Sequence, residues 1–99
     1  MRHYLGFDLG TGAIKGVCWH PSAGVVSSLS ERVKFNAPVP GYLEIDALGY
    51  LDQVLGMIGA LAKSANSDIG GIAFAAASGN TLLCDMKAVP LHPIVSWLD

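Results

Sequence analysis

Phe7-Asp8-Leu9-Gly10-Thr11-Gly12 is the stretch that decides the fold of this chain. Apolar residues alternate with others from Tyr4 into this stretch, and a second alternating run extends from Ala13 to Trp19 after it. Alternation with a period of two is typical of β-strands. The sequence therefore predicts a hairpin whose tip is formed by Gly10, Thr11 and Gly12, with an aspartate just before the turn.

The residue types at this tip suit an oxyanion. Glycine lets backbone N–H groups point at an anion because no Cβ blocks a positive φ or a close approach, and Thr11 adds a hydroxyl. Asp8 would repel a bare phosphate, so its position beside the turn favours a divalent cation between the two groups. On spacing alone, a tight hairpin with a polar tip is an equal alternative, because such a turn is a weak signal.

Lys15 is the only charged residue between Ala13 and Trp19. Four residues past Thr11, it is placed to lean back toward a bound phosphate. A solvent-facing lysine is at least as good an explanation of the same spacing.

The next segments predict a third strand and a helix. Residues 25–34 alternate again, so three sequential strands form an antiparallel meander. From Leu48 to Ala65 the apolar residues recur at the spacing of an amphipathic helix with one buried face, and Asp46 is a suitable N-cap. We expect Gly56 and Gly59 to allow close packing of this helix against the sheet. The apolar positions are Leu48, Leu51, Val54, Leu55, Ile58, Leu61, Ala62 and Ala65.

The C-terminal part predicts further strands. Residues 69–76 form a nearly continuous apolar run, which is typical of a strand buried on both faces and, after a helical crossover, parallel to its neighbour. Residues 81–85 predict another strand, and residues 94–99 close the chain after a turn with Pro90 and Pro93. The fold class expected from this order is α/β.

The composition narrows the class of protein. The chain has 99 residues, of which 52% are hydrophobic and 14% charged, and its net charge is −2. No basic run is present, so neither nucleic acid nor an anionic membrane surface is an expected partner, and no signal peptide or membrane span is recognisable. Cys18 and Cys84 lie in apolar runs and are expected to be core residues in a reducing cytosol, which predicts a cytoplasmic protein.

Three motifs together indicate a family. Asp8-Leu9-Gly10-Thr11 followed by Lys15 resembles the first phosphate motif of the sugar kinase, actin and Hsp70 superfamily. The segment 40–46, Pro-Gly-Tyr-Leu-Glu-Ile-Asp, resembles a Pro-Gly-aromatic-x-Glu-x-Asp marker of FGGY carbohydrate kinases, the group that includes xylulokinase and glycerol kinase. A third match, to a Leu-Leu-x-Asp, Pro-Leu, Trp-x-Asp pattern, is made by Asp85, Pro90-Leu91, Trp97 and Asp99.

This resemblance implies a fold and a reaction. The fold is that of ribonuclease-H-like proteins, with residues 1–99 forming part of the N-terminal domain and the C-terminal domain outside this chain. The activity implied is ATP-dependent phosphorylation of a sugar or polyol hydroxyl with Mg²⁺. The full-length enzyme is expected to supply the general base from outside this chain, so the 99-residue piece alone is expected to be inactive. A homodimer of the full-length enzyme is compatible with the resemblance.

The resemblance also implies residue roles. Asp8 would hold the metal through water, Gly10, Thr11 and Gly12 would cradle the phosphates, and Lys15 would add positive charge near the transferred group. Sugar-site candidates are Ser78, Asn80, Trp97 and Asp99, although a core tryptophan at a strand end explains Trp97 equally well.

Three questions stay open beside the resemblance: the sugar, the reaction class and the role of Glu44. Xylulokinases carry Gln-Met-His-Gly where this chain has Ala-Ser-Gly-Asn at residues 77–80, so the sugar is undetermined. Two other functions compete with a kinase: an ATPase of the chaperone or filament branch, and a non-catalytic module that keeps the fold. Glu44 is either a loop anchor or a residue at the rim of the site.

Overall fold

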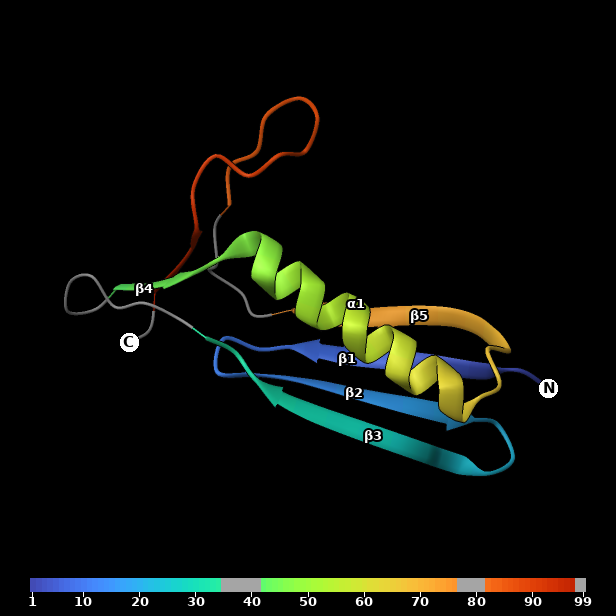
Figure 1. Ribbon diagram of the computed structural model, residues 1–99. Coiled ribbons are helices and arrows are strands. Elements are labelled where there is room, and N and C mark those ends of the chain that lie inside the picture. Colours follow the sequence, from blue (N-terminus) through green and yellow to red (C-terminus); the bar gives the residue numbers. More distant parts are fainter. Residues whose placement is uncertain (35–41, 77–81, 98–99) are drawn as a thin grey trace.

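The computed structural model describes residues 1–34, 42–76 and 82–97 of the chain (Figure 1). One helix lies on a four-stranded sheet, and two short strands form a separate ribbon. No helix in these described ranges is long and apolar enough to cross a membrane. The elements are β1 (His3–Leu9), β2 (Ala13–His20), β3 (Gly24–Arg32), β4 (Tyr42–Ile45), α1 (Ala47–Ser64), β5 (Ile69–Ala76) and β6 (Ile94–Trp97).

The sheet has the strand order β3-β2-β1-β5. The first three strands pair antiparallel in sequence order, and β5 pairs parallel to β1 after the chain has crossed over through α1. This arrangement confirms the predicted α/β fold class, with its antiparallel meander, crossover helix and added parallel strand. The tip between β1 and β2 lies at the end of the sheet where α1 begins (Figure 1).

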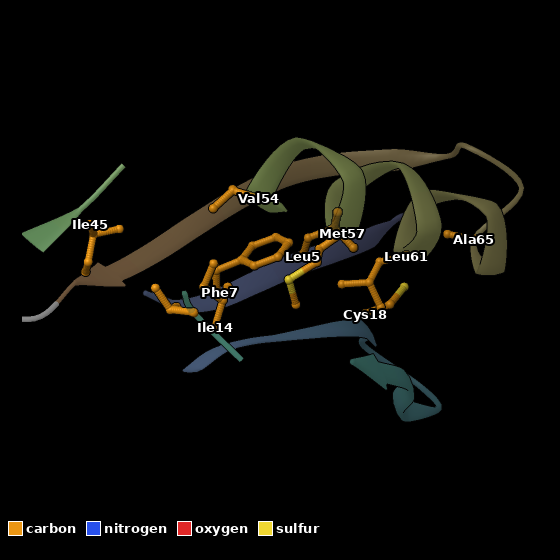
Figure 2. Close-up of a cluster of buried hydrophobic side chains, with 10 residues drawn as sticks. Leu5, Phe7, Ile14, Cys18, Ile45, Val54, Met57, Leu61 and Ala65 are labelled. Atoms are coloured by element: carbon orange, nitrogen blue, oxygen red, sulfur yellow. The ribbon is translucent and has the colours of Figure 1, made fainter. Parts of the chain in front are cut away.

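The core lies between α1 and the sheet, as Figure 2 shows. Alternate residues of the first two strands point toward the helix, because strand side chains alternate between the two faces. Apolar residues of α1 that lie one turn apart pack against these strand side chains and complete a single buried cluster. The cluster contains Leu5, Phe7, Ile14, Cys18, Val33, Ile45, Val54, Met57, Leu61 and Ala65.

Close packing of the helix depends on a glycine of the sheet. A Cβ added at Gly16 of β2 would lie 2.7 Å from Phe7 Cε1 and 2.9 Å from Leu61 Cδ1. The expectation that Gly56 and Gly59 serve this purpose is wrong, because both are exposed and a Cβ on either would meet nothing within 4 Å. They lie on the side of α1 that faces away from the sheet.

The predicted helix start is confirmed at Asp46. Its carboxylate accepts a hydrogen bond of 3.0 Å from Gly49 N, and its carbonyl accepts one of 2.9 Å from Tyr50 N. The first bond satisfies the Gly49 amide, which has no partner within the first turn of the helix, and the second is the first regular hydrogen bond of the helix.

The buried face of α1 is narrower than predicted. Val54, Leu61 and Ala65 are buried together with Met57, but Leu51 and Leu55 are half-exposed. Eighteen residues of helix carry two apolar stripes, and the sheet covers only one of them. Leu48, like Leu51 and Leu55, belongs to the uncovered stripe.

The prediction that β5 is buried on both faces is wrong for this chain. β5 is the last strand of the sheet and has β1 as its one neighbour. Phe74 stacks on Phe7 with the ring centroids 5.6 Å apart, yet it remains 53% exposed. The reason is that α1 lies over β2 and β3, so its cover does not extend to the β5 edge. An apolar pocket of about 270 Å³ remains between Leu51, Val54 and Phe74.

The C-terminal segment differs most from the sequence prediction. In place of a strand over 81–85, the described residues from 82 onward form an isolated bridge between Cys84 and Pro90. Cys84 is exposed rather than a core residue, whereas Cys18 is buried as predicted. The Asp85 carboxylate accepts hydrogen bonds from Lys87 N and Val89 N at 2.8 and 3.0 Å, so it shapes a local turn. The ribbon of β4 and β6, which pairs Tyr42 with Trp97, was not predicted.

Candidate phosphate-binding turn

The turn between β1 and β2 is held by backbone hydrogen bonds at both of its glycines. Gly10 N donates to Ala13 O at 3.0 Å, which closes the turn on itself. Gly12 O accepts from Val33 N at 3.0 Å, which ties the turn to the chain just after β3. The tip is therefore fixed to its own sheet on two sides.

The two glycines have different reasons to be there. A Cβ at Gly10 would lie 2.5 Å from Ala13 O, so the backbone approaches too closely for any side chain. At Gly12 a Cβ would meet nothing within 4 Å, so the space beside it is open. Of the two reasons that the sequence offered for glycine here, a positive φ does not apply, since Gly24 is the one described glycine that has it. Close approach, not a left-handed conformation, requires Gly10.

Two neighbouring N–H groups of the turn are left for a ligand. The Gly10 amide is engaged with Ala13, whereas the amides of Thr11 and Gly12 have no acceptor among the described residues. Successive N–H groups of this kind form a concave donor site for an anion. Of the three residues predicted to cradle phosphate, Thr11 and Gly12 can donate from the backbone, and Gly10 contributes by shaping the turn.

Asp8 and Lys15 flank the turn on the two strands. They are directly opposite each other in the ladder of β1 and β2, and both are exposed. Because Phe7 faces α1, strand alternation places Asp8 on the other face of the sheet, with Lys15 beside it. No salt bridge joins these two described side chains, so both charges remain available to a ligand at the tip.

Tyr50 is a residue of this site that sequence reasoning missed. Its Oη donates a hydrogen bond of 2.8 Å to Gly10 O, across 40 positions of sequence. Burial and then the charge of Asp8 raise the pKa of the Tyr50 hydroxyl above its ordinary value. The hydroxyl therefore stays protonated, and remains a donor, throughout the neutral range. The one signal in the sequence was the position of Tyr50, an aromatic residue with a hydroxyl, one turn past the N-cap of an otherwise apolar helix.

The sugar site stays a prediction, because the side chains of all four candidate residues lie outside what the structure describes. Ser78, Asn80 and Asp99 lie outside the described residues. Trp97 belongs to β6, where its backbone pairs with Tyr42, and its side chain is not described. Glu44 lies on β4 and is half-buried. The described residues contain no group of three or more histidine, cysteine or acidic side chains that could hold a metal ion by themselves.

Comparison with known sequences places the whole chain in one family. Residues 3–99 match the FGGY family of carbohydrate kinases, N-terminal domain. A xylulose kinase from Staphylococcus epidermidis is 33% identical over 98 residues, which are 96% of this chain and 20% of that relative. The chain thus spans about a fifth of the length of the curated relatives that it matches.

Solved structures share the fold. The ligand-bound xylulose kinase from Lactobacillus acidophilus has a TM-score of 0.87 at 22% identity, over 96% of this chain and 19% of that chain. The glycerol kinase from Plasmodium falciparum, solved with ADP, has a TM-score of 0.84 at 17% identity, over 100% of this chain and 21% of that chain. With the family match over residues 3–99, these findings show that this chain belongs to the FGGY family of carbohydrate kinases.

Proposed function

We propose that the full-length protein transfers the terminal phosphoryl group of ATP to a hydroxyl of a sugar or polyol, and that the β1–β2 turn binds the phosphates. Family membership supports the reaction class. The observation that carries the site is the pair of amides at Thr11 and Gly12, which have no acceptor among the described residues and lie beside the open space at Gly12.

The chain's own groups suit this role in distinct ways. The two amides and the Thr11 hydroxyl donate to phosphate oxygens, and Lys15 adds a positive charge from the neighbouring strand. Phosphoryl transfer depends mainly on positioning and on charge stabilisation, which are the contributions that such groups make. Gly10 keeps the turn tight enough for the two donors to remain adjacent.

Asp8 is the residue that would hold Mg²⁺. Its exposed carboxylate offers oxygen ligands, and Mg²⁺ in phosphate sites is commonly bound through one or two carboxylates, several waters and the substrate phosphates. One acidic side chain beside a phosphate turn fits that pattern. When bound, the ion would neutralise phosphate charge. Without a cation, Asp8 would weaken phosphate binding through repulsion.

We infer that the preferred sugar differs from D-xylulose. The curated relatives in the comparison are xylulose kinases, but residues 77–80 read Ala-Ser-Gly-Asn where xylulokinases carry Gln-Met-His-Gly. Side chains of different size and charge at a sugar-contact turn change which hydroxyl groups are recognised.

A coupled assay of ADP release tests the proposed function. Purified full-length protein is assayed with ATP, Mg²⁺ and, in turn, pentuloses, hexuloses, polyols and aldonates. We expect release that depends on one of these substrates, with D-xylulose not the best. ADP release that is equal with and without sugar would favour an ATPase of the chaperone or filament branch. No release and no ADP binding would favour a non-catalytic module.

A further inference from the structure

Tyr50 joins α1 to the phosphate turn at the peptide group that carries one of the predicted donors. Its Oη lies 2.8 Å from Gly10 O, and the carbonyl of Gly10 and the N–H of Thr11 belong to the same peptide. We propose that Tyr50 is a positioning residue that aims the Thr11 N–H at the phosphates of the nucleotide. This inference rests on the proposed function of the turn.

The geometry of the peptide bond makes the connection direct. A peptide group is planar, and in the trans form its C=O and N–H point in opposite directions. No cis peptide bond occurs in the described residues. When the Tyr50 hydroxyl holds the Gly10 carbonyl toward α1, the Thr11 N–H is turned away from the helix, to the outer side of the tip. A hydrogen bond to the carbonyl also polarises the peptide and strengthens its N–H as a donor.

No other described contact gives this constraint. The bond from Gly10 N to Ala13 O fixes the preceding peptide, and the bond from Val33 N to Gly12 O fixes the one after Gly12. The peptide between Gly10 and Thr11 is held by Tyr50 alone among the described residues. Without the hydroxyl, this peptide is free to rotate, because neither Gly10 O nor Thr11 N has another hydrogen bond among the described residues.

Tyr50 is itself firmly placed. Its ring packs against the edge of the core, beside Leu9 and Val54. Its backbone N–H donates to the carbonyl of Asp46, the residue that caps α1. The hydroxyl is thus held by a rigid ring on a capped helix, and burial and then the charge of Asp8 raise its pKa, so it keeps its proton.

The first test is Tyr50→Phe in the full-length protein, which keeps the ring packing and removes the hydroxyl. Without the hydroxyl, the Thr11 N–H is no longer aimed at the phosphate. Losing its hydrogen bond to that charged group costs roughly a factor of ten in binding. We therefore expect the Kd for ADP, measured by calorimetry, and the KM for ATP to rise about tenfold while the KM for the sugar stays unchanged. Tyr4→Phe is the matched control, because Tyr4 is exposed and its hydroxyl has no hydrogen-bond partner among the described residues.

The outcomes separate this inference from the function on which it rests. If the wild type binds ADP and Tyr50→Phe binds it equally well, Tyr50 does not position the turn and the proposed function stands. If the wild type binds no ADP, the proposed function fails first. Equal losses for ATP and for the sugar would show that Tyr50 has a merely structural role.

A second variant keeps the test decisive if Tyr50→Phe does not fold. A ring-fluorinated tyrosine at position 50 has the shape of tyrosine, but its hydroxyl ionises at a lower pH. Below that pH the hydroxyl donates, and above it the phenolate cannot donate to Gly10 O and is repelled by Asp8. We expect ADP affinity to fall across this lowered pKa in the fluorinated protein and to stay constant in the wild type. A flat profile in both proteins would overturn the proposal.

Discussion

Gly10 and Gly12 stand two residues apart in one turn, yet the structure predicts opposite results when each is changed to alanine. The new Cβ at Gly10 would lie 2.5 Å from Ala13 O, a distance that only a backbone shift can relieve. Such a shift also breaks the bond from Gly10 N to Ala13 O. Overpacking costs about 1–3 kcal/mol and a lost hydrogen bond about 1 kcal/mol. We expect Gly10→Ala to destabilise the protein by roughly 2–4 kcal/mol.

Gly12→Ala should leave the fold intact. Its Cβ would meet nothing within 4 Å, and Gly12 has no positive φ, so alanine fits the native backbone. Because alanine has fewer conformations than glycine in the unfolded chain, a stabilisation of about 0.4–1 kcal/mol is expected. The methyl group, however, fills the open space beside the two donors. We expect the Kd for ADP to rise at least about tenfold, since the phosphates can no longer approach both amides.

The pair of variants is measured in the full-length protein by thermal unfolding and by calorimetric titration with ADP in the presence of Mg²⁺. Each glycine serves as the control for the other, because Gly10→Ala is expected to lower stability, whereas Gly12→Ala is expected to weaken ADP binding without lowering stability. A Gly10→Ala variant with wild-type melting temperature would refute the close approach at Gly10. Unchanged ADP affinity in Gly12→Ala would refute the assignment of this turn to the phosphates.

Three further predictions concern the charge beside the turn, the core and the uncovered surface. Asp8→Asn should lower kcat by roughly a hundredfold with little change in the KM for the sugar. The same variant should bind ADP more tightly in EDTA, because a repulsive charge is lost. A near-normal kcat would assign Asp8 a structural role. Gly16→Ala should lower stability by about 1–3 kcal/mol, measured by denaturant unfolding, because its Cβ would contact Leu61 Cδ1 at 2.9 Å; unchanged stability would contradict that contact. The isolated 99-residue chain should self-associate in sedimentation experiments through exposed Leu51 and Phe74, and a stable monomer would contradict this.

The parts of the fold that follow from neighbouring residues could be predicted from the sequence. Alternation gave the meander, helical spacing gave α1 to within one residue at each end, and Asp46 was identified as the cap from its residue type. The crossover rule predicted that β5 runs parallel to its neighbour, and the structure identifies that neighbour as β1. Each of these inferences depends on periodicity or on contacts a few residues apart, which a single sequence records directly.

The predictions that were wrong share a different physical origin, because each depends on contacts between residues far apart in the sequence. Whether a glycine provides close packing depends on the opposing surface, so Gly56 and Gly16 could not be told apart by residue type. The second apolar stripe of α1 was assigned to the core because hydrophobicity shows which residues avoid water, not which surface covers them. The pairing of β4 with β6 joins residues about fifty positions apart, and its short strands carry too few residues for a clear alternation.

The same distinction applies to the site, where the sequence proposed the donors and the structure shows which groups of the turn are hydrogen-bonded to the protein. Gly10 O is bonded to Tyr50 and Gly12 O to Val33, whereas the amides of Thr11 and Gly12 have no acceptor among the described residues. Two carbonyls of the turn are thus engaged with the protein, while its two central amides are available at the tip. Because two carbonyls of the tip are hydrogen-bonded and its two central amides are not, the tip has an edge of free N–H groups that carries a partial positive charge. This positive edge suits an anion and would have no benefit in a turn that only connects two strands. The negative charge of Asp8 opposes that edge, and the proposed Mg²⁺ would allow the two features to act together.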